Sequence, residues 1–230
     1  MSQIVADPSL VSVFPPLPND AFDIIYADPP WDYKGQRQHA GRGNGDTGGA
    51  SYHYPTVTLA LLRQLAVPKI AAENCLLFMW STSPHLDQAI ELGKSWGFSW
   101  ATVGFVWDKQ STNPGYYTLS QCELCLVFKK GRIPQPRGAR DVRQLVSTKR
   151  LHHSAKPDEV RCGIDKMFPT QRKIELFARQ RPHASPKSTD FPEKPPAPEK
   201  PSANLPLLSS AHANPLRSWT FWGLEANRTQ

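Results

Sequence analysis

An apolar run from Phe22 to Ala27 is followed at once by the tetrapeptide Asp28-Pro29-Pro30-Trp31. The run is rich in β-branched and aromatic residues, which predicts a buried strand. Each proline fixes its own φ at about −65° and restricts the residue before it, so we expect Asp28 and Pro29 to be extended. The sequence therefore predicts a rigid acidic corner at the carboxyl end of a strand, the edge at which open α/β sheets bind ligands.

Such a corner suits chemistry on the amino group of a nucleobase. That amino group is a weak nucleophile because its lone pair is delocalised into the ring. A carboxylate from Asp28 and the carbonyl of Pro29 can accept both N–H groups and so orient the nitrogen toward an electrophile. Trp31 can stack on a base that has been taken out of its helix. The alternative is a strand-terminal turn with Trp31 in the core.

The rest of the chain alternates between strand and helix patterns, which predicts an α/β fold with a mostly parallel sheet covered by helices on both faces. The glycine-rich stretch 32–53 is either a flap over the substrate or a connector. Further strands are expected near 75–80, 100–107, 121–128 and 173–178, and helices near 57–72, from Ser83-Pro84 to about Trp96, and from Pro157.

Residues 182–214 carry eight prolines among Lys, Ser and Glu, a composition that is too polar to pack. The run Trp219 to Gly223 is apolar again and is expected to return to the domain. We therefore expect a single domain formed by residues 1–181 and 215–230, with 182–214 as a flexible insertion.

Composition excludes several classes of protein. No stretch approaches the roughly 18 apolar residues of a membrane span, and no basic segment with an apolar core begins the chain as a secretory signal would. The four cysteines lack the spacing of a disulfide framework, which suits a reducing cytosol. Cys122 and Cys125 are spaced like metal ligands, but no second pair matches them and they fall in an expected strand, so no metal site is assigned.

Positive charge is concentrated between residues 129 and 150. The chain carries a formal net charge of +7, and this segment holds eight Lys or Arg residues with only Asp141 opposing them. We expect a basic loop near the active site that binds phosphates, although a solvated surface loop is the alternative. The cations expected to contact substrate are Lys129, Lys130, Arg132, Arg137 and Arg140.

The run Phe22 to Trp31 resembles the catalytic motif of the MT-A70 family of N6-adenine methyltransferases. Further blocks similar to that family occur in the same order: His53–Thr56, Cys75–Trp80, Trp96–Phe98, Val106–Lys109, Ser154–Glu159, Arg172–Arg179 and Trp222–Gly223. The resemblance implies a Rossmann-like fold that uses S-adenosylmethionine, with a permuted motif order in which the cofactor half follows the catalytic motif. It also implies that Asp28, Pro29, Pro30 and Trp31 are catalytic.

Carried over by position, the resemblance implies a cofactor pocket beside Asp28. The residues implied to contact S-adenosylmethionine are Asp28, Lys156, Phe177, Arg179 and Glu225. Those implied to lie near the target base are Tyr33 and Glu123. The family usually has Asn after Trp-Gly, whereas this chain has Leu224, so Glu225 is expected to carry more of the ribose contact.

The expected function is N6-adenine methylation of DNA, with low sequence specificity, on a flipped or single-stranded adenine. We expect a cytoplasmic protein of bacterial or prophage origin that acts as a monomer or homodimer without a partner subunit. Three alternatives stay open: an RNA adenosine methyltransferase, an inactive relative that binds nucleic acid, and a methyltransferase for small molecules or proteins.

Overall fold

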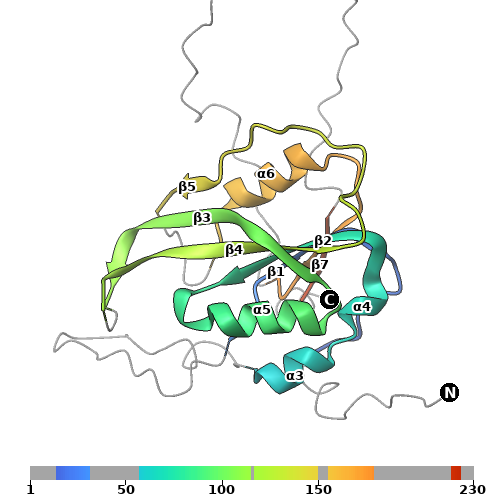
Figure 1. Ribbon diagram of the computed structural model, residues 1–230, viewed down its shortest axis with the longest axis horizontal. Helices are drawn as coiled ribbons and strands as arrows, with labels where there is room; N and C mark the ends of the chain where they lie inside the picture. The colour runs from blue at the N-terminus through green and yellow to red at the C-terminus, as the bar shows by residue number, and fades with distance from the viewer. Residues whose placement is uncertain (1–13, 32–56, 115–116, 150–154, 179–218, 224–230) are drawn as a thin grey trace, which may run out of the picture.

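The computed structural model describes residues 14–31, 57–114, 117–149, 155–178 and 219–223, and all structural statements below concern these ranges (Figure 1). They form one seven-stranded sheet in the order β5-β3-β4-β2-β1-β6-β7. β4 is antiparallel to both of its neighbours, and every other pairing is parallel. The strands are β1 (Phe22–Ala27), β2 (Ala71–Ser81), β3 (Ser99–Asn113), β4 (Ser120–Lys130), β5 (Leu145–Ser147), β6 (Lys173–Leu176) and β7 (Trp219–Trp222).

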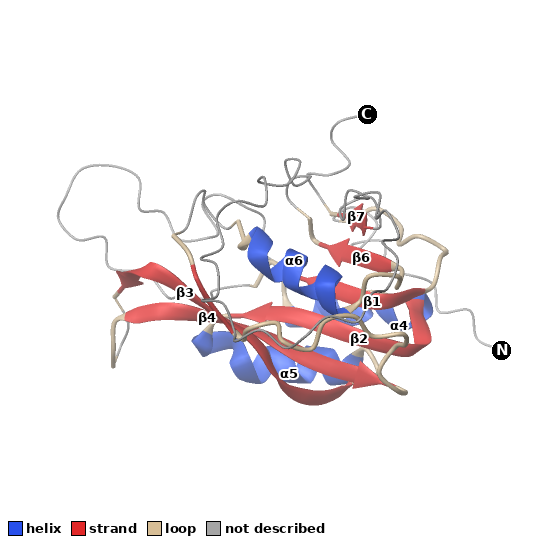
Figure 2. Ribbon diagram, turned by 90° about the horizontal axis from the view of Figure 1, so that it is seen from above, coloured by secondary structure: helices blue, strands red, loops and turns tan. Residues whose placement is uncertain are grey.

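Helices cover both faces of the sheet, which confirms the predicted mostly parallel α/β architecture. The α6 helix lies on one face, and α3, α4 and α5 lie on the other (Figures 1 and 2). The helical elements are α3 (Leu59–Gln64), α4 (Val67–Ile70), the 3₁₀ turn η1 (Ser83–His85), α5 (Leu86–Ser95) and α6 (Asp158–Met167). None of the helices in the described ranges is long and apolar enough to span a membrane.

Strand β1 is covered on both faces, which explains why its sequence is apolar at nearly every position. Ile25 and Ala27 pack in the core on the α5 side, whereas Ile24 and Tyr26 pack in the core on the α6 side. Successive side chains of a strand point to opposite faces, so a strand covered on both sides needs a continuous apolar run. The strand predicted at 22–27 is therefore β1, an interior strand between β2 and β6.

The helix expected near 57–72 is instead two short helices. Leu65 adopts an extended backbone conformation after α3, with ψ 129°, and the chain restarts as α4. Pro68 occupies the first turn of α4, where its missing N–H costs no hydrogen bond. The chain enters β2 at Ala71, four residues earlier than the pattern predicted.

Polar contacts fix α6 to the sheet. The guanidinium of Arg161 donates to both carboxylate oxygens of Glu175 in β6, at 2.6 and 2.9 Å. The same guanidinium lies over the ring of Tyr26, 5.7 Å from its centroid. On the next turn, Asp165 accepts a hydrogen bond from Trp219 Nε1 at 2.9 Å and pairs with the buried Lys173. These bonds link α6 to β1, β6 and β7.

We predict that Arg161→Ala lowers the free energy of unfolding by about 3–5 kcal/mol, because it leaves the Glu175 carboxylate buried without its partner. Urea unfolding followed by circular dichroism measures the loss. Arg63→Ala is the matched control, since Arg63 pairs with Glu91 on the surface, with exposed side-chain fractions of 38% and 58%. That variant should lose at most about 1 kcal/mol. Equal losses in the two variants would contradict this account.

Candidate active site

The carboxyl edge of the sheet gathers the candidate catalytic residues. Asp28 follows β1, which lies between β2 and β6 in the sheet. The next strand along the chain, β2, pairs with one edge of β1, and β6 pairs with the other edge. This is the topological switch point at which open α/β sheets bind ligands. Glu123 reaches the same edge from the opposite direction, because β4 is antiparallel and begins there.

Four charged side chains at this edge form what we call the ionic chain: Asp28, Lys156, Glu123 and Lys109. Lys156 Nζ lies 3.2 Å from Asp28 Oδ1 and 2.7 Å from Glu123 Oε2. Lys109 Nζ lies 3.3 Å from Glu123 Oε1. The sequence blocks thus meet in space, with Asp28 and Glu123 bridged by a single ammonium group.

The ionic chain is electrically balanced and largely screened from water. Its exposed side-chain fractions range from 5% for Lys109 to 14% for Asp28. Burial by itself raises the pKa of Glu123, but the charges and hydrogen bonds of Lys156 and Lys109 outweigh it and the pKa is lowered. The Glu123 carboxylate is therefore ionised at neutral pH.

Two aromatic side chains, Trp80 and Tyr26, help to hold the ammonium group of Lys156 in place. This ammonium lies 5.4 Å from the centroid of the Trp80 ring, a cation–π contact. Trp80 Nε1 in turn donates to the hydroxyl of Tyr26 at 2.6 Å. Burial raises the pKa of Tyr26 well above its ordinary value, so this hydroxyl stays neutral. Lys156 is therefore positioned by residues of β1 and β2 as well as by its own segment before α6.

The tetrapeptide corner is closed by backbone hydrogen bonds. The N–H of Trp31 donates to the carbonyl of Pro29 at 2.9 Å, and the N–H of Val57 donates to the carbonyl of Pro30 at 3.0 Å. Trp31 and Val57 also form an isolated parallel bridge. A carbonyl has two lone pairs, so Pro29 can still accept a bond from a substrate amino group.

Trp31 does not present its ring as expected. It is 4% exposed, its Nε1 donates to the carbonyl of Trp80 at 3.3 Å, and its ring stacks on His85 with centroids 5.9 Å apart. We expected Trp31 to stack on the target base, but its ring occupies the core, which was the alternative. The bond from the indole to the Trp80 carbonyl ties the corner to β2.

On the cofactor side, Phe177 directly follows β6 with a φ of 62° and is 7% exposed. Its ring makes edge contacts with Phe14 and Trp222, at 5.5 Å in each case. Phe177 thus packs in the core at the β6 end of the switch point. The remaining expected cofactor and base contacts lie outside the described residues, as do the stretch 32–53 and Leu224; they are Tyr33, Arg179 and Glu225.

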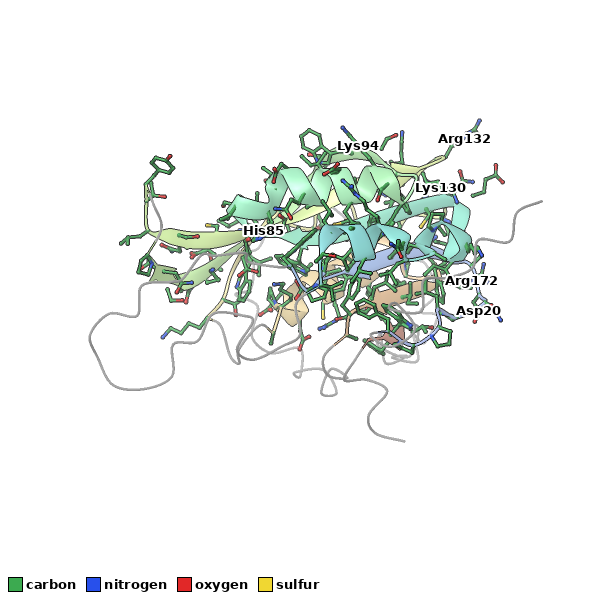
Figure 3. All side chains as sticks on the ribbon, turned by 90° about the horizontal axis from the view of Figure 1, so that it is seen from below. Asp20, His85, Lys94, Lys130, Arg132 and Arg172 are labelled. Atoms are coloured by element: carbon green, nitrogen blue, oxygen red, sulfur yellow. The ribbon has the colours of Figure 1, made fainter. Side chains whose placement is uncertain are left out.

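The basic segment lies mostly away from the ionic chain, which corrects its expected place near the site. Lys129 and Lys130 pair with Leu76 and Cys75 in the first half of β2, because β4 runs antiparallel and ends at the amino edge. Lys130 lies seven positions after Glu123 along β4, a distance of about 23 Å. Figure 3 accordingly shows Lys130 and Arg132 at the end of the molecule opposite to His85.

The segment then follows α6 back toward the carboxyl edge. The guanidinium of Arg137 lies over the Phe168 ring at 5.4 Å, and the N–H groups of Gly138 and Ala139 bond to the last carbonyls of α6. Arg137 and Arg140 are therefore also remote from Asp28. The segment returns to the carboxyl edge of the sheet only at the end of β5, and the exposed Lys149 follows there.

Two site residues were not predicted. Lys109 had a signal in the sequence, because it lies two positions after Trp107 on the same strand and so shares its buried face. His85 follows the Ser83-Pro84 helix start, but nothing in the pattern pairs it with Trp31. Its Nδ1 lies 2.9 Å from the hydroxyl of Thr82.

The MT-A70 family profile matches residues 22–189, which include the corner and the whole ionic chain. The chain belongs to the MT-A70 family of methyltransferases. It is 54% identical over 180 residues to the Type II methyltransferase M.MunI of a Mycoplasma species, covering 74% of this chain and 77% of that protein. It is 29% identical over 170 residues to the human N(6)-adenosine-methyltransferase catalytic subunit METTL3, covering 70% of this chain but 26% of that protein.

Members of the MT-A70 family use S-adenosylmethionine as methyl donor, and the described residues fit part of that molecule. Its amino-acid end carries an ammonium and a carboxylate, and the switch point offers Asp28 and Lys156 as groups of opposite charge. The cluster of Phe177 with its aromatic neighbours lies at the end of β6 on the same edge, but these rings are buried in the core and offer little surface to the adenosine end.

We predict that Lys156→Met destabilises the fold more at neutral pH than in acid. The pKa of Glu123 is lower in the folded chain, so its ionised form stabilises the fold above about pH 4.3 and this contribution is lost as the pH falls. Without Lys156, Asp28 and Glu123 lose their shared cation, and an ionised Glu123 then destabilises the fold. Protonation of Glu123 in acid removes this destabilisation. Urea unfolding at several pH values measures the difference.

Lys69→Met is the control for this comparison, since Lys69 is an exposed residue of α4. Its effect on unfolding should be small at every pH. If the free energy of unfolding lost in Lys156→Met does not change with pH, the proposed contribution of the ion pairs of Lys156 is wrong.

Proposed function

We propose that this methyltransferase transfers a methyl group from S-adenosylmethionine to N6 of adenine in DNA. One observation carries the proposal: the Asp28 carboxylate stands at the switch point, next to the Pro29 carbonyl, and is held in place by Lys156 at 3.2 Å. Two acceptors at fixed positions match the two N–H groups of an exocyclic amine. The eukaryotic relatives named N(6)-adenosine-methyltransferases support the choice of nitrogen.

In the proposed reaction, Asp28 and Pro29 accept the two N–H groups of adenine and turn the nitrogen lone pair toward the methyl carbon. S-adenosylmethionine supplies an electrophilic methyl group. The lone pair forms the new N–C bond while the C–S bond breaks and its electrons go to sulfur. The nitrogen becomes positively charged and then loses one proton to solvent. A carboxylate beside the developing positive charge stabilises it, and its fixed position avoids the cost of reorganisation.

Lys156 has the role of a positioning residue in this proposal. It bridges Asp28 and Glu123, so one cation sets the distance between the two carboxylates. Glu123 is bonded to lysines through both oxygens, yet a carboxylate has about four acceptor positions and can still contact the base. Lys156 also keeps its proposed role near the carboxylate of the cofactor.

DNA is the proposed polymer because of the relative named Type II methyltransferase, which the chain matches over 77% of its length. RNA is the second candidate, since the relatives named as adenosine methyltransferases match at 28–30% identity. We further propose a cytoplasmic protein, bacterial or prophage-encoded, that acts as a monomer or homodimer. The pairing of β7 with β6 supports a single domain made of residues 1–181 and 215–230, with 182–214 as an insertion.

We predict that Asp28→Ala lowers the rate of methyl transfer by at least about 10²–10³-fold, because one of the two preorganised acceptors is lost. Labelled methyl transfer to DNA under single-turnover conditions measures the rate. Asp20→Ala, at an exposed position before β1, is the matched control and should keep the wild-type rate. Circular dichroism establishes that both variants are folded. Near-normal activity of folded Asp28→Ala would refute the proposed mechanism.

The choice of polymer is tested with one sequence prepared as duplex DNA, single-stranded DNA and RNA. We expect labelled methyl groups in one or both DNA forms and little label in RNA. Label in RNA alone would reject DNA as the substrate while leaving adenine chemistry intact. No transfer to any of the three, with S-adenosylmethionine still bound, would favour an inactive relative.

A further inference from the structure

The hairpin that joins β3 to β4 carries exposed apolar side chains beside the candidate active site. Tyr117 is 99% exposed and Leu119 is 66% exposed. Among the large hydrophobic residues that the structure describes as exposed, these two have the highest exposed fractions. Adjacent apolar groups at a projecting tip mark a surface that is covered when a partner binds.

The tip is connected directly to the ionic chain. Lys109 lies in β3 and Glu123 lies in β4, so both strands of the hairpin contribute a charged group at its base. Tyr117 lies six positions before Glu123, which limits their distance to about 20 Å. Figures 1 and 2 show β3 and β4 extending together past the neighbouring strands. A polymer bound at the site therefore passes within reach of the tip.

Hydrogen bonds to Asp108 hold the base of the hairpin. Asp108 accepts hydrogen bonds from Gln121 Nε2 at 2.6 Å, from the N–H of Gln110 at 2.9 Å and from the hydroxyl of Ser147 at 3.2 Å. Gln110 has a φ of 53°, and the pairing register shifts between Asp108 and Asn113. Such an irregularity bends a strand and re-aims the residues beyond it.

The described part of the hairpin carries no acidic side chain between its ends that would repel a polyanion. Between Asp108 and Glu123 the chain has no acidic residue and one cation, Lys109. The exposed Lys149 follows β5, which pairs with β3 beside the hairpin base. Lys109 is buried and paired with Glu123, so the exposed Lys149 is the cation beside the hairpin that can meet a phosphate, behind an uncharged tip that can meet a base stack.

We propose that this hairpin tip is a wedge that opens duplex DNA. Tyr117, supported by Leu119, enters the base stack next to the target adenine and occupies the space that the adenine leaves when it turns toward Asp28. Enzymes that modify a base must take it out of the stack, and inserted apolar side chains lower the cost of unstacking. This inference rests on the proposed function, because it needs DNA as the substrate.

The test compares Tyr117→Ala with the wild-type chain on two substrates. One is a fully paired duplex that the wild-type chain methylates, and the other is the same duplex with a mismatched base opposite the target adenine. We expect kcat/KM of Tyr117→Ala to fall about tenfold or more on the paired duplex and less than about threefold on the mismatched one, where unpairing costs little. Tyr117→Trp, which keeps a large ring, should retain the wild-type ratio.

Trp100→Ala is the matched control, because Trp100 is a 49% exposed aromatic of β3 that pairs with Phe128 toward the other end of β4. It should behave as the wild-type chain on both substrates. Equal losses by Tyr117→Ala on the two duplexes, or no loss on either, would overturn the wedge. So would a change in sedimentation of Tyr117→Ala without DNA, because the tip would then contact another protein chain. A wild-type chain that methylates no DNA would refute the proposed function itself, and the wedge with it.

Discussion

The ion pairs of Lys156 hold the two halves of this site together. Asp28 comes from the end of the interior parallel strand β1, whereas Glu123 comes from β4, which runs opposite to the other strands of the described sheet. Two carboxylates at this spacing repel each other when water is largely excluded, so the arrangement requires a shared cation. The packing of Lys156 on Trp80 and the bonds from α6 to β6 determine where that cation lies.

The interior strand β1 and its acidic corner could be predicted from the sequence because both depend on local rules. A continuous apolar run is what a strand buried on two faces needs, and two prolines end it at a defined residue. The match between Phe22–Ala27 and β1 follows from this. The break between α3 and α4 was missed, because apolar periodicity continues across Leu65 while the backbone there is extended.

The placement of the cations depended on topology that local patterns do not contain. From its charge alone, we predicted that the basic segment lies at the site. Because β4 is antiparallel, Lys130 lies at the opposite edge of the sheet and Glu123 lies at the edge of the candidate active site. Trp31 illustrates the same limit at one residue. Its type suits base stacking and core packing equally, and only the three-dimensional position of His85 and Trp80 decides between them.

The central claim is that Asp28 and Pro29 select an exocyclic amino group of adenine. The most direct measurement follows a labelled methyl group from S-adenosylmethionine into DNA and identifies the modified nucleoside after complete digestion. This account predicts that the label is recovered in N6-methyldeoxyadenosine, because two acceptors at the corner match the two N–H groups of that amine. Recovery of the label in a methylated cytosine would contradict it.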